Sequence, residues 1–508
     1  MALANHDTPA ARKAATAALN LNPSSLDALR VVAQSAGDEA VVETLILHEK
    51  VLQQSGPHPA AQDLRNYVRL CMDLNFQASS AAALDQLVAD YGNEAETWVL
   101  AGEYLLAGGK LDTALNAAER ALEIDPENIS ARLLGCRITL WSTDSEIQNA
   151  AISKLLEFGK RTDSVGLEAL AILATAPVSL SSPASETAAA GLRSHTQSNS
   201  DARLMAAMVE YRAAEPEAKQ EIVDRTVAAF STGDLMPLLG WLHLAQRHEE
   251  IIRLLPEEQA LKNPAQFGAL ATALQLTGKD AELLKLFTDH QGEVPMNVYH
   301  RNLMEMHSHK KLGETASARR NWNVALRTAR AQNPEVSLVL IAQWCEKNGH
   351  PAEAIEAFEA LLEQHRDLVS HWYDALVRLY RQTGNTPRLL QISRDLAAAY
   401  PENPVYQHNA AYLTILSEPE PLEAIRSLEA VMKQYPQITG SRCAVALGYF
   451  RLGNTAAARE TVGSLDRKSL TGLDQLILDT VTGEKGAASS STLPEDLLPE
   501  ERALFGLQ

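Results

Sequence analysis

The sequence predicts an all-α fold in which antiparallel helix pairs stack into a solenoid. Hydrophobic residues make up 46% and charged residues 21% of the 508 residues, so the chain has enough apolar side chains to fold. Runs rich in Val, Ile or Thr and bounded by turn residues are few, so we expect strands to be scarce. Aromatic residues make up only 5%, which suits closely packed Ala-rich helices. A turn residue also recurs about every 35 residues, as a stack of similar units requires.

The beginning of the chain is typical of the second helix of a pair whose first helix is mostly missing, with Ala11, Ala15 and Leu19 on one face. Residues 26–56 and 60–92 are expected to form further pairs. Because solenoids usually cap their ends, one hypothesis is a native chain that starts upstream, with a membrane anchor and a periplasmic location. Otherwise we expect a cytoplasmic protein, since the sequence holds no signal peptide and no apolar run of about 20 residues.

The clearest helix pair covers residues 95–128. Gly102, Ala114 and Ala121 are small where the two helices are expected to cross, so that the backbones can approach closely. Gly109 suits the left-handed backbone conformation that ends the first helix. Pro126 ends the second helix, because proline disfavours a helical conformation of the residue before it.

This pattern, which also includes Trp98 and Leu105, resembles the tetratricopeptide repeat, a helix–turn–helix unit of 34 residues. The resemblance implies a right-handed superhelical solenoid. It also implies a non-enzymatic scaffold or adaptor that binds a protein or an extended peptide in its concave groove. We further expect a bacterial source.

The same pattern returns in six units in the second half of the chain. Successive turn positions are separated by 35, 36, 35, 35 and 34 residues. A random chain has no reason to keep this period, so these units predict a regular array over residues 264–470. The turn residues are Gly278, Gly313, Gly349, Gly384, Pro419 and Gly453.

Two stretches interrupt the array and suggest a domain organisation. Residues 178–187 are rich in Ser and contain a Pro, which predicts a loop or a joint between an N-terminal array at 1–177 and a C-terminal array at 188–480. Residues 481–508 are expected to form a flexible tail, because residues 483–492 have the composition of a linker. The leucines after this linker could belong to a short helix that docks back or binds a partner.

The sequence contains no recognisable catalytic or metal-binding motif. It has no P-loop, no GxGxxG after a strand, no HExxH and no GxSxG, so we expect neither an enzyme nor a cofactor. His300 and His307 are two helical turns apart, roughly 10 Å, which is too far to share one metal. The alternative is an enzyme with an unrecognised domain at residues 140–260. The cysteines are expected to be small core residues, since no two form a CxxC pair: Cys71, Cys136, Cys345 and Cys443.

The charge argues against a nucleic-acid partner. The formal net charge is −19, whereas nucleic-acid binding draws its affinity from Lys and Arg. The alternative is a single-stranded RNA-binding protein of the pentatricopeptide type, which the 35-residue spacing also resembles.

The resemblance to tetratricopeptide repeats implies that the first helix of each pair lines the groove. We expect Arg and Lys side chains there to grip the carboxylates of an acidic peptide, with aromatic side chains adding apolar contact. The alternative is that these residues form ordinary solvated helix faces. The pattern lacks the Lys/Asn clamp of family members that bind chaperone tails, so no chaperone partner is implied. The expected groove residues are His300, His307, Lys310, Lys311, His371, Asp374, Arg378, Arg381, Tyr406, Asn409, Phe450 and Arg451.

Overall fold

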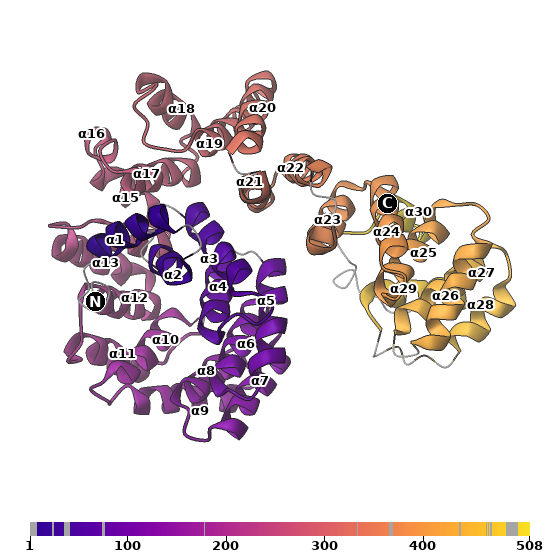
Figure 1. The fold of residues 1–508 in the computed structure, drawn as a ribbon, viewed down its shortest axis with the longest axis horizontal. Coiled ribbons are helices and arrows are strands. Elements are labelled where there is room, and N and C mark those ends of the chain that lie inside the picture. Colours follow the sequence, from indigo (N-terminus) through magenta and orange to yellow (C-terminus); the bar gives the residue numbers. More distant parts are fainter. Residues whose placement is uncertain are drawn as a thin grey trace. The chain divides into compact units, whose positions relative to one another are not determined.

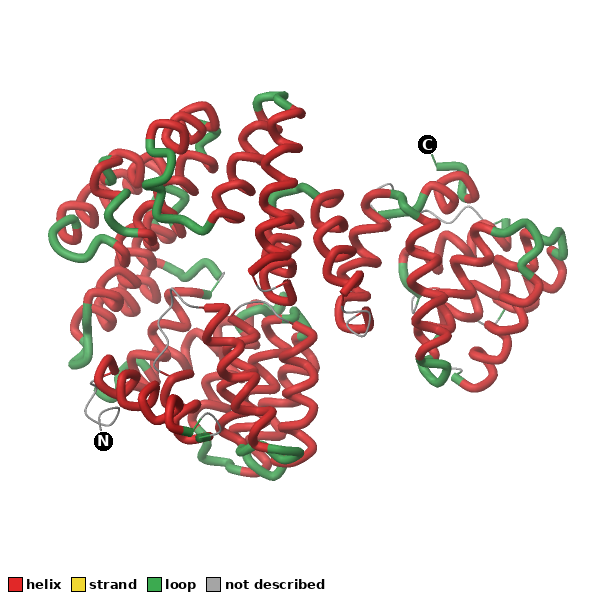
Figure 2. Tube along the Cα trace, turned by 45° about the horizontal axis from the view of Figure 1, so that its top comes forward, coloured by secondary structure: helices red, strands yellow, loops and turns green. Residues whose placement is uncertain are grey.

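A computed structural model confirms the all-α class. It describes residues 8–22, 25–34, 41–73, 77–176, 178–332, 334–364, 369–435, 438–463, 465, 467, 470–483 and 496–507. These residues form thirty helices, and Figure 2 shows no strand among them. None of the helices in this described part is both long and apolar enough to cross a bilayer.

The chain divides into two compact units, residues 1–297 with 308–315 and residues 298–307 with 316–508. Helix α19 (Val298–Lys311) contributes to both units. The helices of the first unit are α1 (Thr8–Leu21), α2 (Leu26–Gln34), α3 (Val41–Ser55), α4 (Ala61–Asp73), α5 (Gln77–Tyr91), α6 (Ala95–Ala107), α7 (Leu111–Ile124), α8 (Ile129–Thr139), α9 (Ser145–Phe158), α10 (Ser164–Thr175), α11 (Ser182–Ser194), α12 (Ser200–Ala213), α13 (Pro216–Phe230), α14 (Met236–Leu244), α15 (His248–Leu254), α16 (Glu257–Ala260), α17 (Pro264–Leu276) and α18 (Asp280–Asp289).

The second unit continues the same architecture of consecutive helices that pack against one another (Figure 1). Its remaining helices are α20 (Thr315–Gln332), α21 (Pro334–Lys347), α22 (Pro351–Gln364), α23 (Val369–Thr383), α24 (Thr386–Ala399), α25 (Pro404–Ser417), α26 (Leu422–Gln434), α27 (Thr439–Arg451), α28 (Thr455–Val462), α29 (Gly472–Thr482) and α30 (Pro499–Leu504).

Small residues hold the helices of a pair close together, as the sequence predicts. Ala114 and Ala121 of α7 are fully buried. A Cβ atom on Gly102 of α6 would lie 3.3 Å from the carbonyl oxygen of Ala114 and 2.6 Å from a methyl group of Leu134. The missing side chain therefore lets α6 lie against both α7 and α8.

The predicted turn glycines all adopt the left-handed backbone conformation. Their φ angles lie between 66° and 80°, a region in which only glycine is free of steric cost. The residue after each glycine closes the turn: the N–H of His350 donates to the carbonyl of Cys345 at 2.8 Å, for example. Pro419 lies in the loop between α25 and α26 without breaking either helix. The glycines are Gly109, Gly278, Gly313, Gly349, Gly384 and Gly453.

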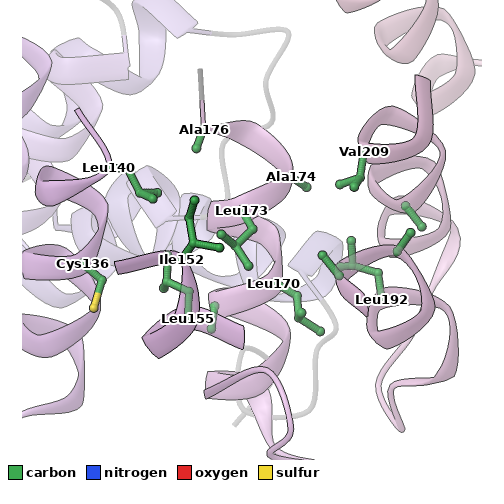
Figure 3. Close-up of a cluster of buried hydrophobic side chains, with 14 of the residues drawn as sticks. Cys136, Leu140, Ile152, Leu155, Leu170, Leu173, Ala174, Ala176, Leu192 and Val209 are labelled. Carbon is green, nitrogen blue, oxygen red and sulfur yellow. The ribbon is translucent and has the colours of Figure 1, made fainter. Parts of the chain in front are cut away.

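Larger apolar side chains fill the spaces between pairs. Figure 3 shows one such cluster, which spans α8 to α12 and contains Leu170, Leu173 and Leu192. Leu170 needs two glycines to fit, because a Cβ on Gly159 or Gly191 would come within 2.6 Å or 3.0 Å of its methyl groups. The four cysteines are also buried, in agreement with the expected core role.

The predicted loop at residues 178–187 differs from the structure. Helix α11 begins at Ser182, so the second half of this range is helical. Ser181 is the N-cap and Pro183 occupies the first turn, which means that the Ser-Pro signal marked a helix start and not a joint. The division of the chain into two compact units also falls near residue 297 and not at residues 178–187. Of the linker predicted at residues 483–492, residues 484–492 lie outside the described residues.

Candidate functional site

Helices α23 and α25, each the first helix of its pair, lie beside each other and share polar and aromatic contacts. Tyr373 of α23 accepts a hydrogen bond from the amide of Asn409 at 3.1 Å and lies 2.8 Å from the hydroxyl of Ser393 on α24. The ring of Tyr406 meets the ring of Tyr373 edge-on, with 5.3 Å between centroids. These bonds fix the relative positions of α23, α24 and α25. The structure thus brings together two expected groove residues, Tyr406 and Asn409.

Arg381 on the same surface binds the C-terminal segment of the chain. Its Nη2 donates to Oε2 of Glu501 at 2.7 Å, and its Nε donates to Oδ2 of Asp496 at 3.1 Å. The side chain of Arg381 is only 14% exposed, and that of Glu501 is fully buried. The arginine that was expected to hold an acidic peptide is therefore occupied by an acidic segment of the same molecule.

Glu501 is the centre of this contact because both of its carboxylate oxygens are satisfied. The hydroxyl of Tyr412 on α25 donates to Oε1 at 2.8 Å. The backbone N–H of Leu498 donates to Oε2 at 2.7 Å and closes the first turn of α30. A buried carboxylate needs such partners, because an unpaired charge away from water is costly.

Two leucines anchor the segment beside this charge. The side chains of Leu497 and Leu498 are 5% and 0% exposed. Pro499 packs on the turn between α23 and α24, where a Cβ on Gly384 would lie 3.1 Å from its ring. The glycine that ends α23 thus also leaves room for the segment. We call the surface of Arg381, Thr386 and Tyr412 the arginine site, and residues 496–507 the C-terminal segment.

The edge of the arginine site is polar and partly open. The hydroxyl of Thr386 donates to Oε2 of Glu500. A hollow of about 610 Å³ remains beside the segment, and Arg378 and Gln382 help to line it. Arg378 itself pairs with Glu346 of α21, with 2.6 Å between Nε and Oε1, and its side chain stays 58% exposed.

The electrostatic environment keeps the guanidinium of Arg381 and the hydroxyl of Tyr412 protonated. Burial lowers the pKa of Arg381, but the neighbouring charges of Glu501 and Asp496 more than offset this effect, so its pKa is raised. The pKa of Tyr412 lies well above its usual range, first because the phenol is buried and second because Glu501 is negatively charged. At neutral pH the arginine site therefore presents a cation and a hydroxyl donor to a carboxylate.

Other expected groove residues have different surroundings. His307 is buried, and its Nδ1 lies 2.9 Å from Nε2 of His350, so its side chain does not offer the expected contact to a partner. The reason is that its ring fills the space against Trp344. His300 is half-buried, and burial lowers its pKa.

The remaining expected residues differ in their exposure and in their contacts. Asp374 is exposed and Phe450 is half-buried, while Arg451 donates to the backbone carbonyl of Glu418 at 3.1 Å. Lys310 and Lys311 are exposed but belong to the first compact unit. The side chain of His371 lies outside the described residues. Among the residues that the structure describes, no three His, Cys, Asp or Glu side chains are grouped so that they could hold a metal ion.

The residues that sequence analysis missed are Glu501, Tyr412 and Thr386. One sequence signal could have pointed to Tyr412, which stands seven residues before the turn residue Pro419. Small residues fill the equivalent position in four other pairs, so a tyrosine there indicates a contact that the other pairs lack. Those small residues are Gly102, Ala271, Ala342 and Ala446.

Sequence analysis also missed a second hollow, which lies in the first unit on the first helices of several pairs. It measures about 850 Å³ and lies against α6, α8 and α10. Trp141, which is 50% exposed, lines it together with Arg137 and Glu168. The hollow combines an apolar floor with one charge of each sign.

Comparison with known proteins supports the repeat in the first unit. The family model of the tetratricopeptide repeat matches residues 95–128. The match has the length of a single repeat. This repeat corresponds to α6 and α7, whose close packing depends on Gly102 and Ala114. No curated protein matches the sequence.

Two solved structures align with nearly the whole chain, both with low scores. A chain of the APC/C hetero-tetramer Cut9-Hcn1 aligns with a TM-score of 0.28 and 11% identity, over 99% of this chain and 94% of that one. A chain of the Naa15/Naa10 complex bound to HypK-THB aligns with a TM-score of 0.27 and 13% identity, over 100% of this chain and 93% of that one. Scores this low carry no argument about the partners of the present chain.

Proposed function

We propose that the protein is a non-enzymatic interaction scaffold that binds an acidic segment of a partner protein on the first helices of its second unit. The observation that supports this proposal is the arginine site, where Arg381 and Tyr412 hold a buried carboxylate. A surface that binds a peptide segment of its own chain has the chemistry to bind a similar segment of another protein.

The proposal includes Arg378 as a contact to the partner. Its guanidinium lines the hollow beside the C-terminal segment and is more than half exposed, so a bound segment could reach it. Tyr406 and Asn409 extend the same surface along α25. Phe450 and Arg451 on α27 belong to the proposed surface as well, because α27 packs against α25.

Charge reversal of Arg378 tests the scaffold. The full-length protein is immobilised, proteins captured from an extract of the producing cells are identified, and one purified partner is titrated against each variant. We expect Arg378→Glu to weaken binding roughly tenfold, because a hydrogen bond to a charged group contributes about 1.5–3 kcal/mol. Arg426→Glu is the matched control, since Arg426 is an exposed arginine on the second helix α26. Equal binding by Arg378→Glu and wild type, with helicity intact, would contradict the proposal.

We further propose that nucleic acid is not the partner and that the protein is cytoplasmic and bacterial. The net charge of −19 supports the first statement, because a chain with this excess of carboxylates repels phosphates. Filter binding with single-stranded RNA at low salt tests it, and salt-dependent retention of the RNA would contradict it. Localisation of the native protein in its source cells tests the second statement.

A further inference from the structure

The C-terminal segment has the chemistry that the arginine site recognises. It reads Asp-Leu-Leu-Pro-Glu-Glu at residues 496–501, with buried leucines beside a buried glutamate. We propose that this segment is a resident competitor, and that the partner carries a segment of the same kind: two adjacent leucines followed by proline and glutamate. This inference rests on the proposed function and adds to it the recognition chemistry and its control.

The segment contacts the arginine site through specific side chains. Glu501 receives hydrogen bonds from Arg381 and Tyr412, while Thr386 reaches Glu500. An ion pair that is taken out of water adds little net stability, because desolvation offsets the attraction. Such a pair does select for a carboxylate at one position, since any other group would leave the buried Arg381 with only the half-exposed carboxylate of Asp496 as a counter-charge.

The segment depends on the surface for its structure. Helix α30 has only six residues, which is too short to be stable alone in water. The bonds that join α23, α24 and α25 through Tyr373 do not involve the segment. Release of the segment therefore leaves these three helices connected and exposes Arg381 and Tyr412 to a partner.

The covalent connection determines how strongly the segment competes. Residues 484–495 link it to α29, and their sequence is rich in Ser and Ala. A linker of this length gives an effective concentration on the order of 1 mM. A free peptide identical to the segment must compete with this concentration, so its apparent Kd for the wild-type protein stays at or above about 1 mM, however tightly the peptide binds the open site. A partner must bind more tightly or be present when the segment is released.

Substitutions of Glu501 and of Arg381, the two partners of one ion pair, should change peptide binding in opposite directions. In the full-length protein, Glu501→Lys places a positive charge opposite Arg381 and releases the segment. A fluorescein-labelled peptide with the sequence of residues 493–508 should then bind at least about tenfold more tightly than to wild type, because its competitor is gone. Arg381→Glu removes the site itself, so the double variant Arg381→Glu/Glu501→Lys should not bind the peptide. Glu423→Lys on the exposed start of α26 is the matched control and should bind as wild type does.

Fluorescence anisotropy measures these affinities, and circular dichroism confirms that each variant is folded. Equal binding of the peptide by Glu501→Lys and wild type would overturn the proposal that the segment is a competitor. Binding of the peptide by the double variant Arg381→Glu/Glu501→Lys would overturn it as well. A large fall in the melting temperature of Glu501→Lys would also overturn it, since the segment would then be an integral part of the fold. A wild-type dimer that grows with concentration and disappears in Glu501→Lys would assign the surface to a second copy instead. The proposed scaffold function is tested separately, because the Arg378→Glu experiment measures the binding of a partner protein and not of this peptide.

Discussion

Removal of one hydroxyl should release the C-terminal segment without unfolding the helices beneath it. In Tyr412→Phe, Oε1 of Glu501 loses its hydrogen-bond donor while it remains buried. A hydrogen bond to a charged group contributes roughly 1.5–3 kcal/mol, and its loss costs at least as much when the acceptor stays dry. The segment can avoid this cost by leaving the surface, so the expected response is local opening.

Hydrogen exchange measures this opening directly. The backbone N–H groups of Arg502 and Phe505 bond to the carbonyls of Leu498 and Glu501, both at 2.9 Å, only while α30 is formed. A loss of about 1.5–3 kcal/mol corresponds to roughly 10- to 100-fold faster exchange of these amides. Amides in α23 to α26 should exchange at the wild-type rate, because the hydrogen bonds within these helices and the contacts among them do not involve the segment.

Tyr449→Phe is the matched control for this experiment. The hydroxyl of Tyr449 on α27 also donates to a glutamate, Glu429 of α26, but both residues are only half-buried. Water can replace that donor, so we expect a change of less than about 1 kcal/mol and no effect on α30. Unchanged exchange of residues 502–507 in Tyr412→Phe would refute the reasoning, since the buried carboxylate would then not need its partner.

Two further predictions concern the turns of the repeat and the dependence of the protein's stability on pH. Gly349→Ala should destabilise the second unit by about 1–2 kcal/mol in urea unfolding, because Gly349 has a φ of 74°. Gly268 lies inside α17 with open space around it, so Gly268→Ala should stabilise the first unit by about 0.5–1 kcal/mol. Burial lowers the pKa of His408 below 6.5, although Asp474 partly opposes this, so the unfolded chain binds the proton more readily. Stability should therefore fall as the pH drops below about 6.5, and His408→Gln should flatten this dependence in unfolding measured from pH 5 to 8.

Sequence reasoning succeeded where a feature depends on residues close together in the chain. The turn at Gly349 was predictable because a left-handed residue after a helix requires glycine. The close approach of α6 and α7 was predictable because Gly102 and Ala114 leave no side chain between the backbones. The same local reasoning placed Ser182 and Pro183 in a loop or joint, since these residue types begin loops and helices alike.

The candidate site was predictable only in part. Position within the repeat selected Arg381 and Asn409 as surface residues of the second unit, but it also selected His307, which is buried against His350 and Trp344. A repeat pattern specifies which face of a helix a residue occupies. It does not specify whether a neighbouring side chain covers that residue.

The sequence by itself determined the helical class, the period of the array and the conformation of its turns, because backbone sterics and small side chains act over a few residues. Only the tertiary structure decided what Arg381 binds. Glu501 lies 120 residues further along the chain, and no local pattern relates the two positions. Their pairing depends on the path by which the chain returns to α23 and α25, where burial makes one carboxylate and one guanidinium require each other.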